Sequence, residues 1–323
     1  MSLFILRRLG VTVLLLIVIS VLIFGIIQLT PGDAVDMMLG GVAQDSLGEE
    51  TVETLRRQLG LDLPVYQQYF NWIKGVLQGD MGTSLIMKAP VGPIILQRLK
   101  TSLLLAVPAS LMMVFFGLTL GVWSAVKENS IIDHFISFST LSMISIPAFL
   151  VGSIFIYIFS VKLNWIPAAF NALPFEQYPF WRRVGFFFTV LIFPSLTLSF
   201  ESVAYVARQT RASMIEELKT NYVRTAVLKG VRPQRVITSH ALRNALLPAI
   251  TVIAFNIGYI LAGVVIVEAV FSYPGIGNLM VIAINNRDTP LILGTMLIIA
   301  GAYVLANFIA DILYSVFNPR IEY

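Results

Sequence analysis

Long uncharged runs constrain the fold of this chain more than any other feature of its sequence. Six runs without Lys, Arg, Asp or Glu occupy residues 9–32, 101–126, 135–161, 184–200, 244–267 and 289–310. Five exceed the roughly 20 residues that cross a bilayer core, and the fourth reaches that length if it continues past Glu201 to Ala207. Only 12% of the 323 residues are charged, about half the fraction typical of soluble proteins. The pattern predicts an all-α polytopic membrane protein with six transmembrane helices.

The six runs also limit the domain organisation. The longest segments between them are residues 33–100 and 208–243, and we expect neither to form a separate soluble domain. We therefore expect a single transmembrane domain over residues 1–323. The first run is longer than the core of a secretory signal and no small-residue cleavage site follows it, so we expect a retained helix.

The basic residues predict the orientation. Cytoplasmic loops of membrane proteins carry an excess of Lys and Arg, a rule that holds for loops of up to about 60 residues. With the N-terminus in the cytoplasm and the longer 33–100 loop left aside, 12 Lys and Arg residues fall in inner segments and 4 in outer ones. Both termini are therefore expected in the cytoplasm. The net charge of +4 fits inner loops that face anionic lipid and requires no nucleic acid. The absence of cysteine leaves the redox compartment open.

Residues 33–100 carry signals for two short amphipathic helices. Ser46 and Glu49 have the spacing of a capping box, and Gly60 stands where a helix would end. Pro64 can begin a second helix, whose aromatic residues are Tyr66, Tyr69, Phe70 and Trp72. Two interpretations stay open: these helices pack on the bundle or bilayer, or they bind another protein.

The spans contain prolines, small residues and a few polar groups. Pro108, Pro147, Pro194 and Pro248 occur once each in spans two to five and predict kinked helices. Small residues in the last two spans predict close helix packing: Gly258, Ala262, Gly263, Gly294 and Gly301.

Polar side chains in the spans are candidates for a translocation pathway, because such groups are costly in hydrocarbon and usually face the interior. The candidates are Ser139, Ser142, Ser145, Glu201, Asn256 and Asn307. A structural alternative applies to the acidic residues near the inner surface: Glu201 and Asp311 can instead pair with Arg208 and Arg320.

Residues 208–243 contain 8 basic and 2 acidic residues, and their order predicts two helices. Thr220 or Asn221 can cap the first helix, which ends at Gly230 and carries Tyr222, Val223, Ala226 and Val227 on one face. Pro233 can begin the second helix, which leads into span five. Basic residues alone are enough to keep a loop in the cytoplasm, and two ordered helices are not needed for that purpose. We therefore expect a cytoplasmic partner to bind to these helices.

These residues also carry a family resemblance. Residues 222–230 (YVRTAVLKG) and 240–248 (HALRNALLP) resemble the EAA loop of ABC-importer permeases in the dipeptide, oligopeptide and nickel group. Five further segments resemble the first permease of that group, in order: Phe4–Leu9, Leu29–Asp33, Gly79–Ser84, Phe271–Gly277 and Arg287–Pro290. Arg224 replaces the Glu of the motif's name, and the spacing from Gly230 to Pro248 is longer than in sugar importers.

The resemblance implies a type I ABC-importer permease fold and an ATPase-coupling loop. The implied coupling residues are Tyr222, Arg224, Thr225, Ala226, Lys229, Gly230, His240, Arg243, Asn244 and Pro248. In such importers the loop sits in a cleft of the ATPase. Ala226 and Gly230 would allow close approach, and Tyr222 would be a buried anchor. Arg224 and Lys229 would pair with acidic residues of the cleft.

The resemblance also implies partners. They are a homologous second permease, two cytoplasmic ATPase subunits that bind ATP and Mg²⁺, an extracytoplasmic solute-binding protein and membrane lipid. The chain itself is expected to be non-catalytic and without a cofactor, because it has no G-x-x-x-x-G-K-[ST] phosphate loop. The implied location is the cytoplasmic membrane of a bacterium or archaeon.

Di- and oligopeptides are the solutes that the resemblance favours, and nickel chelates, glutathione and oligosaccharides are alternatives within the same group. An autonomous secondary transporter is a second class, but the two halves show no convincing repeat and charge in the spans is sparse. A membrane metalloenzyme is a third. His134 and His240 are far apart in sequence, and there is no H-E-x-x-H motif and no cysteine.

Overall fold

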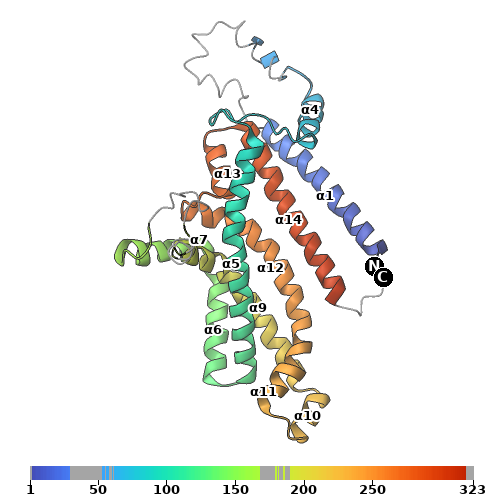
Figure 1. Ribbon diagram of the computed structural model, residues 1–323, viewed down its shortest axis with the longest axis vertical. Coiled ribbons are helices and arrows are strands. Elements are labelled where there is room, and N and C mark those ends of the chain that lie inside the picture. The colour runs from blue at the N-terminus through green and yellow to red at the C-terminus, as the bar shows by residue number, and fades with distance from the viewer. Residues whose placement is uncertain are drawn as a thin grey trace. The chain divides into compact units, whose positions relative to one another are not determined.

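The computed structural model describes residues 2–29, 62–167 and 190–317, with a few single residues in the gaps between them. Every regular element in these stretches is helical (Figure 1). The helices are α1 Ser2–Gln28, α4 Val65–Leu77, α5 Val91–Val126, α6 Ile131–Ser145, α7 Ala148–Phe155, η1 Ile156–Lys162, α9 Ile192–Leu218, α10 Asn221–Leu228, α11 Pro233–Arg235, η4 Val236–Ala241, α12 Leu242–Val270, α13 Ile276–Asn285 and α14 Thr289–Phe317. The prediction of an all-α chain is confirmed.

Four stretches of helix in the described chain are long and apolar enough to cross a bilayer. They are Leu6–Gln28, Val91–Val126, Pro233–Val270 and Thr289–Ile312. These stretches cover the first, second, fifth and sixth predicted spans, and they confirm a polytopic membrane protein. The third and fourth predicted spans have a different form in the structure.

The third predicted span, residues 135–161, is broken rather than continuous. α6 and the pair α7–η1 meet at an angle of 101°, and together they can form one broken span or a re-entrant loop. The break lies at Ile146, which is extended (φ −99°, ψ 118°), and at Pro147, which precedes the first residue of α7. A residue before proline is driven out of the helical region, and proline has no N–H to donate. The predicted kink at Pro147 is therefore a sharp turn.

The fourth predicted span, residues 184–200, is only partly described, since residue 184 and residues 186–189 lie outside the described residues. From Ile192 the chain forms α9, which continues without interruption to Leu218. The predicted inner segment 208–243 therefore begins as the direct extension of this helix. A movement at its inner end can be passed along a single rigid element.

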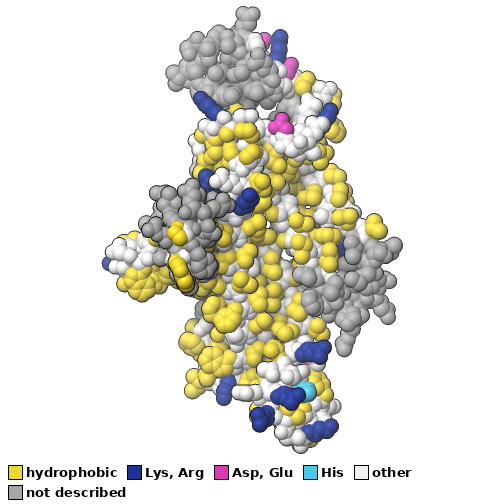
Figure 2. All heavy atoms as spheres, in the orientation of Figure 1, with side chains coloured by type: hydrophobic (Ala, Val, Ile, Leu, Met, Phe, Trp, Pro, Cys, Tyr) yellow, Lys and Arg dark blue, Asp and Glu magenta, His cyan; other side chains and the backbone are white. Residues whose placement is uncertain are grey.

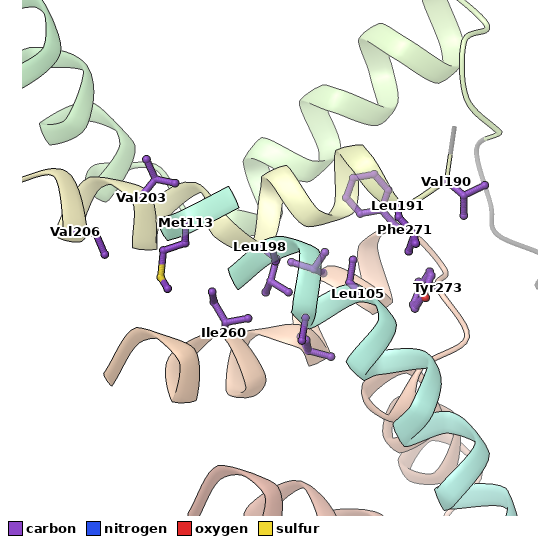
Figure 3. Close-up of a cluster of buried hydrophobic side chains, with 14 residues drawn as sticks. Leu105, Met113, Val190, Leu191, Leu198, Val203, Val206, Ile260, Phe271 and Tyr273 are labelled. Carbon is purple, nitrogen blue, oxygen red and sulfur yellow. The ribbon is translucent and has the colours of Figure 1, made fainter. Parts of the chain in front are cut away.

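The chain has two compact units. The first comprises residues 1–8, 103–273 and 305–323, and the second comprises residues 9–102 and 274–304. The core of the first unit is formed where α5, α9 and α12 pack together (Figure 3). Leu105 and Met113 of α5, Leu198 and Val206 of α9 and Ile260 of α12 are buried there.

Two glycines allow α5 to pack directly against α9 in the first unit. A Cβ at Gly121 would lie 2.6 Å from the carbonyl oxygen of Ala207 and 2.6 Å from the Cβ of Thr210. A Cβ at Gly117 would lie 2.6 Å from the Cβ of Val206. These are backbone or Cβ atoms, which cannot rotate away. Neither glycine was predicted from the sequence as a packing residue. At Gly263, which was, the nearest atom lies 3.4 Å from an added Cβ.

In the second unit, Asp288 joins two segments that are far apart in the sequence. Its fully buried carboxylate accepts hydrogen bonds from the Ser84 hydroxyl, from the Ile86 N–H at 3.2 Å and from the Leu291 N–H at 3.2 Å. The bond to Leu291 caps the first turn of α14. Ser84 and Asp288 belong to two of the segments that carry the family resemblance.

The predicted helix after Pro64 is confirmed as α4, which packs on α1 within the second unit. The Tyr69 ring lies 5.6 Å from that of Phe24, and its hydroxyl lies 2.8 Å from the Ser20 hydroxyl oxygen. The Trp72 ring lies 5.7 Å from Phe24. These two aromatic residues therefore pack on the protein itself. Gly60 has a φ of +67°, as a helix end requires, whereas the predicted capping box at residues 46–49 lies outside the described residues.

Candidate functional site

The segment after α9 folds as its turn signals predict. Thr220 is extended and precedes α10, which begins at Asn221. The Thr220 hydroxyl does not cap α10 but donates 2.6 Å back to the Glu217 carbonyl. Gly230 follows the helix with a φ of +74°, a conformation that other residues rarely adopt. The predicted helix and its glycine stop are both confirmed.

The predicted second helix begins at Pro233 and continues through α11 and η4 into α12. Residues 236–241 form a π-helical turn, which the sequence did not predict. Such turns insert an extra residue into a helix and shift the side chains that follow. The segment from α10 to Gly230 is therefore attached to a spanning helix through one short turn.

One face of α10 packs on the protein itself. Val223 and Ala226 are buried against Val236, Ala241 and Ala245. The predicted apolar face of Tyr222, Val223, Ala226 and Val227 is therefore only half correct, because Tyr222 is 41% exposed and Val227 57% exposed. Ala226, which was expected to allow close approach of a partner, is only 8% exposed. Its three-residue spacing from Val223 places it on the inner side of the helix.

The opposite face of α10 is apolar at its centre and basic around it. Val227 is 57% exposed and Leu228 79% exposed. The exposed side chains near them along the chain are Arg224, Thr225, Lys229, Arg232 and Arg235. Figure 2 shows Lys and Arg side chains gathered over α10 and α11. We call Val227, Leu228, Arg224 and Lys229 the α10 surface.

Three of the predicted coupling residues form a network inside the chain. The Tyr222 hydroxyl donates to the carboxylate of Glu217 and accepts a hydrogen bond from Asn244 Nδ2 at 2.9 Å. The carbonyl of His240 lies 3.3 Å from the same hydroxyl. Burial, followed by the bond to Glu217, raises the pKa of Tyr222 above its usual 10.0. Tyr222 thus ties α10 to both α9 and α12, rather than pointing outward as a free anchor.

The other predicted coupling residues, apart from the buried Ala226, are exposed. Thr225 uses its hydroxyl within α10, donating to Asn221 at 2.9 Å. Gly230, Arg243 and Pro248 are exposed, the last two on α12. Leu228 was not predicted as a coupling residue. Val223 and Ala226, one helical turn apart, mark the inner face of α10, and helical geometry then places Leu228 on the outer face.

The predicted pathway residues that have side-chain hydrogen bonds make them to other partners than one another. Ser142 and Ser145 donate within α6, to Phe138 and Leu141, each at 3.0 Å. Asn256 donates within α12, to Val252 at 2.9 Å. Among the described residues, no hydrogen bond joins any two of Ser139, Ser142, Ser145, Glu201, Asn256 and Asn307.

Each of the two acidic residues has a partner that the sequence did not predict. Asp311 pairs with Arg8, with a nitrogen–oxygen distance of 2.8 Å, and Arg320 lies outside the described residues. Glu201 accepts a hydrogen bond from the Tyr259 hydroxyl at 3.0 Å instead of pairing with Arg208. The two partners, Arg8 and Tyr259, are distant in sequence, so local spacing could not identify them.

The arrangement of spanning helices and a basic inner segment can be compared with known proteins. The family model described as "Binding-protein-dependent transport system inner membrane component" matches residues 117–323, and its N-terminal companion matches residues 1–106. The chain belongs to this family. The permease is thus a multi-pass inner-membrane protein and a non-catalytic subunit of an ABC transporter, in which separate subunits hydrolyse ATP. The family resemblance inferred from the sequence is confirmed.

The permease is similar to curated relatives over its whole length. It is 36% identical to a probable peptide ABC transporter permease protein of Sinorhizobium fredii, with 100% of both chains covered. It is 38% identical to the di/tripeptide transport system permease protein DppB of Pseudomonas aeruginosa, over 99% of this chain and 98% of that one. It is 35% identical to the glutathione transport system permease protein GsiC of Escherichia coli K12, over 99% of each.

Proposed function

We propose that the permease forms, with a homologous second permease, the membrane pathway of an ATP-driven importer of di- and oligopeptides. Residues 1–323 act as one transmembrane domain, with residues 33–100 outside the cell and residues 208–243 and both termini in the cytoplasm. An extracytoplasmic binding protein delivers the solute. Two cytoplasmic ATPase subunits bind ATP and Mg²⁺. Relatives named for peptide and di/tripeptide transport support the solute class.

The α10 surface is the observation that carries the coupling part of the proposal. Two apolar side chains, Val227 and Leu228, are exposed beside Arg224 and Lys229 on a helix whose inner face is buried. An apolar centre with a basic border fits a cleft that is apolar inside and acidic at its rim. The two exposed apolar side chains are unfavourable in water, and a protein cleft of this chemistry would bury them.

The network at Tyr222 explains how binding at α10 can act on the pathway. α10 is hydrogen-bonded to Glu217 of α9 and Asn244 of α12, and both of these helices continue into the membrane region. A push on α10 therefore moves two long helices together. ATP binding that closes the ATPase dimer would use these helices as levers to open the pathway outward, and ADP release would reverse the movement.

The test is Leu228→Ala in the assembled complex, with Ile131→Ala as the matched control. Ile131 is 89% exposed and is the first residue of α6. We expect Leu228→Ala to weaken binding of the ATPase subunits to the permease about tenfold. Ile131→Ala should change it less than twofold. Equal ATPase binding by Leu228→Ala and the unmutated permease would contradict the role of the α10 surface.

Glutathione is the second candidate solute, because one of the relatives is named for it. The solute that the extracytoplasmic binding protein carries distinguishes the two candidates, whereas the sequence of this chain does not. Mass spectrometry of the solute that co-purifies with the binding protein should show a mixture of short peptides. Glutathione alone would replace the peptide proposal and leave the ATP-driven mechanism unchanged.

A further inference from the structure

One face of α9 differs from the lipid-facing surfaces of the protein. Most of this helix is buried, but Tyr205 is 41% exposed, Arg208 is exposed and Glu201 is partly exposed, all on one side. Exposed positions of α1 are apolar instead, such as Leu14 and Ile17. Charged side chains are costly against hydrocarbon. The polar face of α9 is therefore suited to water or protein.

Glu201 lies well inside this helix. It is nine residues from the first residue of α9, which corresponds to about 14 Å along the axis. Its partner Tyr259 lies 11 residues before the end of α12, about 17 Å from that end. Both Glu201 and Tyr259 thus lie within helices that continue in both directions, rather than at a helix end.

Two phenol rings accompany the carboxylate. Tyr259 of α12 donates its hydroxyl proton to Glu201 Oε2 at 3.0 Å. Tyr205 follows Glu201 by one turn of α9 and therefore lies on the same side of that helix. Tyr259 is 51% exposed, so both rings remain accessible. Within the described residues, no Lys or Arg forms an ion pair with Glu201.

We propose that Glu201, Tyr205 and Tyr259 form a passing site for an ammonium group, and that this group is the N-terminal ammonium of a translocating peptide. The inference rests on the proposed function of peptide import. A carboxylate attracts the cation, and the faces of the two aromatic rings add cation–π attraction. The bond from Tyr259 holds one carboxylate oxygen, which leaves the other to meet the ammonium. An α-amino group is largely protonated at neutral pH.

The site is built for brief occupancy. It offers one negative charge and two aromatic rings on a part-exposed surface, rather than an enclosed pocket. A site on a pathway must bind strongly enough to admit the solute and weakly enough to release it. Recognition of the ammonium alone would also explain how one pathway accepts peptides with different side chains, because every unmodified peptide carries this group.

The test measures binding to the purified complex of both permeases and both ATPase subunits, without the binding protein. The probes are dialanine with a fluorophore on its C-terminus and the same compound acetylated on its N-terminus. Fluorescence anisotropy gives both dissociation constants. We expect the unmutated complex to bind the free-amine probe about fivefold more tightly. Glu201→Gln should reduce this preference to less than twofold.

Three variants separate recognition from effects on folding. Glu201→Asp keeps the charge and should retain most of the preference, and Tyr259→Phe should weaken it. Glu216→Gln removes an exposed carboxylate near the other end of α9 and should leave it unchanged. No preference in the unmutated complex, or a full preference in Glu201→Gln, would overturn the proposal. Pairing of Glu201 with an Arg of the second permease would neutralise the carboxylate, so it predicts the former result, together with weaker permease assembly in Glu201→Gln.

Failure of this site and failure of peptide import give different results. ATP-driven uptake of dialanine by the unmutated complex in proteoliposomes tests import directly. If uptake occurs but Glu201→Gln keeps its preference for the free amine, only the ammonium site is wrong. If no peptide uptake occurs with peptide-loaded binding protein present, import itself is wrong, whatever the probes show.

Discussion

Tyr222 on α10 donates its hydroxyl proton to the carboxylate of Glu217, the penultimate residue of α9. Because the same oxygen accepts a hydrogen bond from Asn244 of α12, one side chain joins three helices. The predicted coupling residues thus divide into two sets. Tyr222 and Asn244 hold α10 in place, whereas Arg224 and Lys229 are exposed beside it.

Tyr222→Phe should uncouple ATP hydrolysis from uptake without preventing ATPase binding. The substitution removes the hydroxyl and two hydrogen bonds, each worth about 1 kcal/mol, but leaves the α10 surface intact. We expect the amount of peptide imported per ATP to fall several-fold. Tyr66→Phe, at an exposed position of α4, should leave the ratio unchanged. A normal ratio in Tyr222→Phe would show that the network does not transmit movement.

The stabilising effect of the Tyr222 hydroxyl should depend on pH in one direction. Its pKa in the folded protein is raised above 10.0, so its contribution is complete below the unfolded pKa and is lost as pH rises through the folded one. The difference in Tm between the unmutated permease and Tyr222→Phe should be constant from about pH 6 to 9. It should shrink only in more alkaline buffer. A difference that shrinks on acidification would contradict this assignment.

Asp133→Asn should destabilise the permease markedly. Arg211 donates to both carboxylate oxygens of Asp133, from Nε at 2.7 Å and from a terminal nitrogen at 2.8 Å, and joins α9 to α6. Asp133 is buried, so the substitution leaves a partly buried guanidinium without its counter-charge, at a cost of about 3 kcal/mol. Thermal unfolding in detergent measures the loss.

The matched control uses the exposed ion pair between Lys219 and Glu128, whose nitrogen–oxygen distance is 2.8 Å. Lys219 is 63% exposed, and surface pairs contribute at most about 1 kcal/mol. Lys219→Gln should therefore have a small effect on Tm. Equal losses in Asp133→Asn and Lys219→Gln would mean that burial does not strengthen the Asp133–Arg211 pair.

Gly121→Ala should separate α5 from α9. The added methyl would lie 2.6 Å from the carbonyl oxygen of Ala207, well inside contact distance, so one helix must shift. We expect a loss of about 2 kcal/mol in stability and lower yield of folded protein. Gly25→Ala, where no atom lies within 4 Å, should be neutral or slightly stabilising. An unchanged Tm for Gly121→Ala would show that the two helices are not held this closely.

Local signals were sufficient for much of the fold. Uncharged runs identified the spanning stretches, and Gly230 and Pro233 marked the end of one helix and the start of the next, because glycine and proline act through their own backbones. The bend of 101° at Pro147 was predicted only as a kink. How far a broken helix turns depends on what it packs against, which one segment of sequence does not contain.

Contacts between distant segments could not be predicted in this way. Tyr259 lies 58 residues from Glu201, and nothing in the sequence of either helix indicates that they meet. The same holds for Gly121 and α9. Ala226 shows the opposite error: its role was transferred from a family motif, but its side chain packs inward on Val223's side of α10. Residue type alone does not determine which face of a helix meets a partner.

Uptake into proteoliposomes tests the central claim most directly. The permease, its homologous partner and two ATPase subunits are reconstituted with peptide-loaded binding protein outside and ATP inside, and radiolabelled dialanine is counted in the lumen. We predict accumulation that requires both ATP and the binding protein and that Leu228→Ala reduces about tenfold. Proton-gradient-driven uptake by the permease alone, or ATP-driven uptake that Leu228→Ala leaves unchanged, would contradict the account.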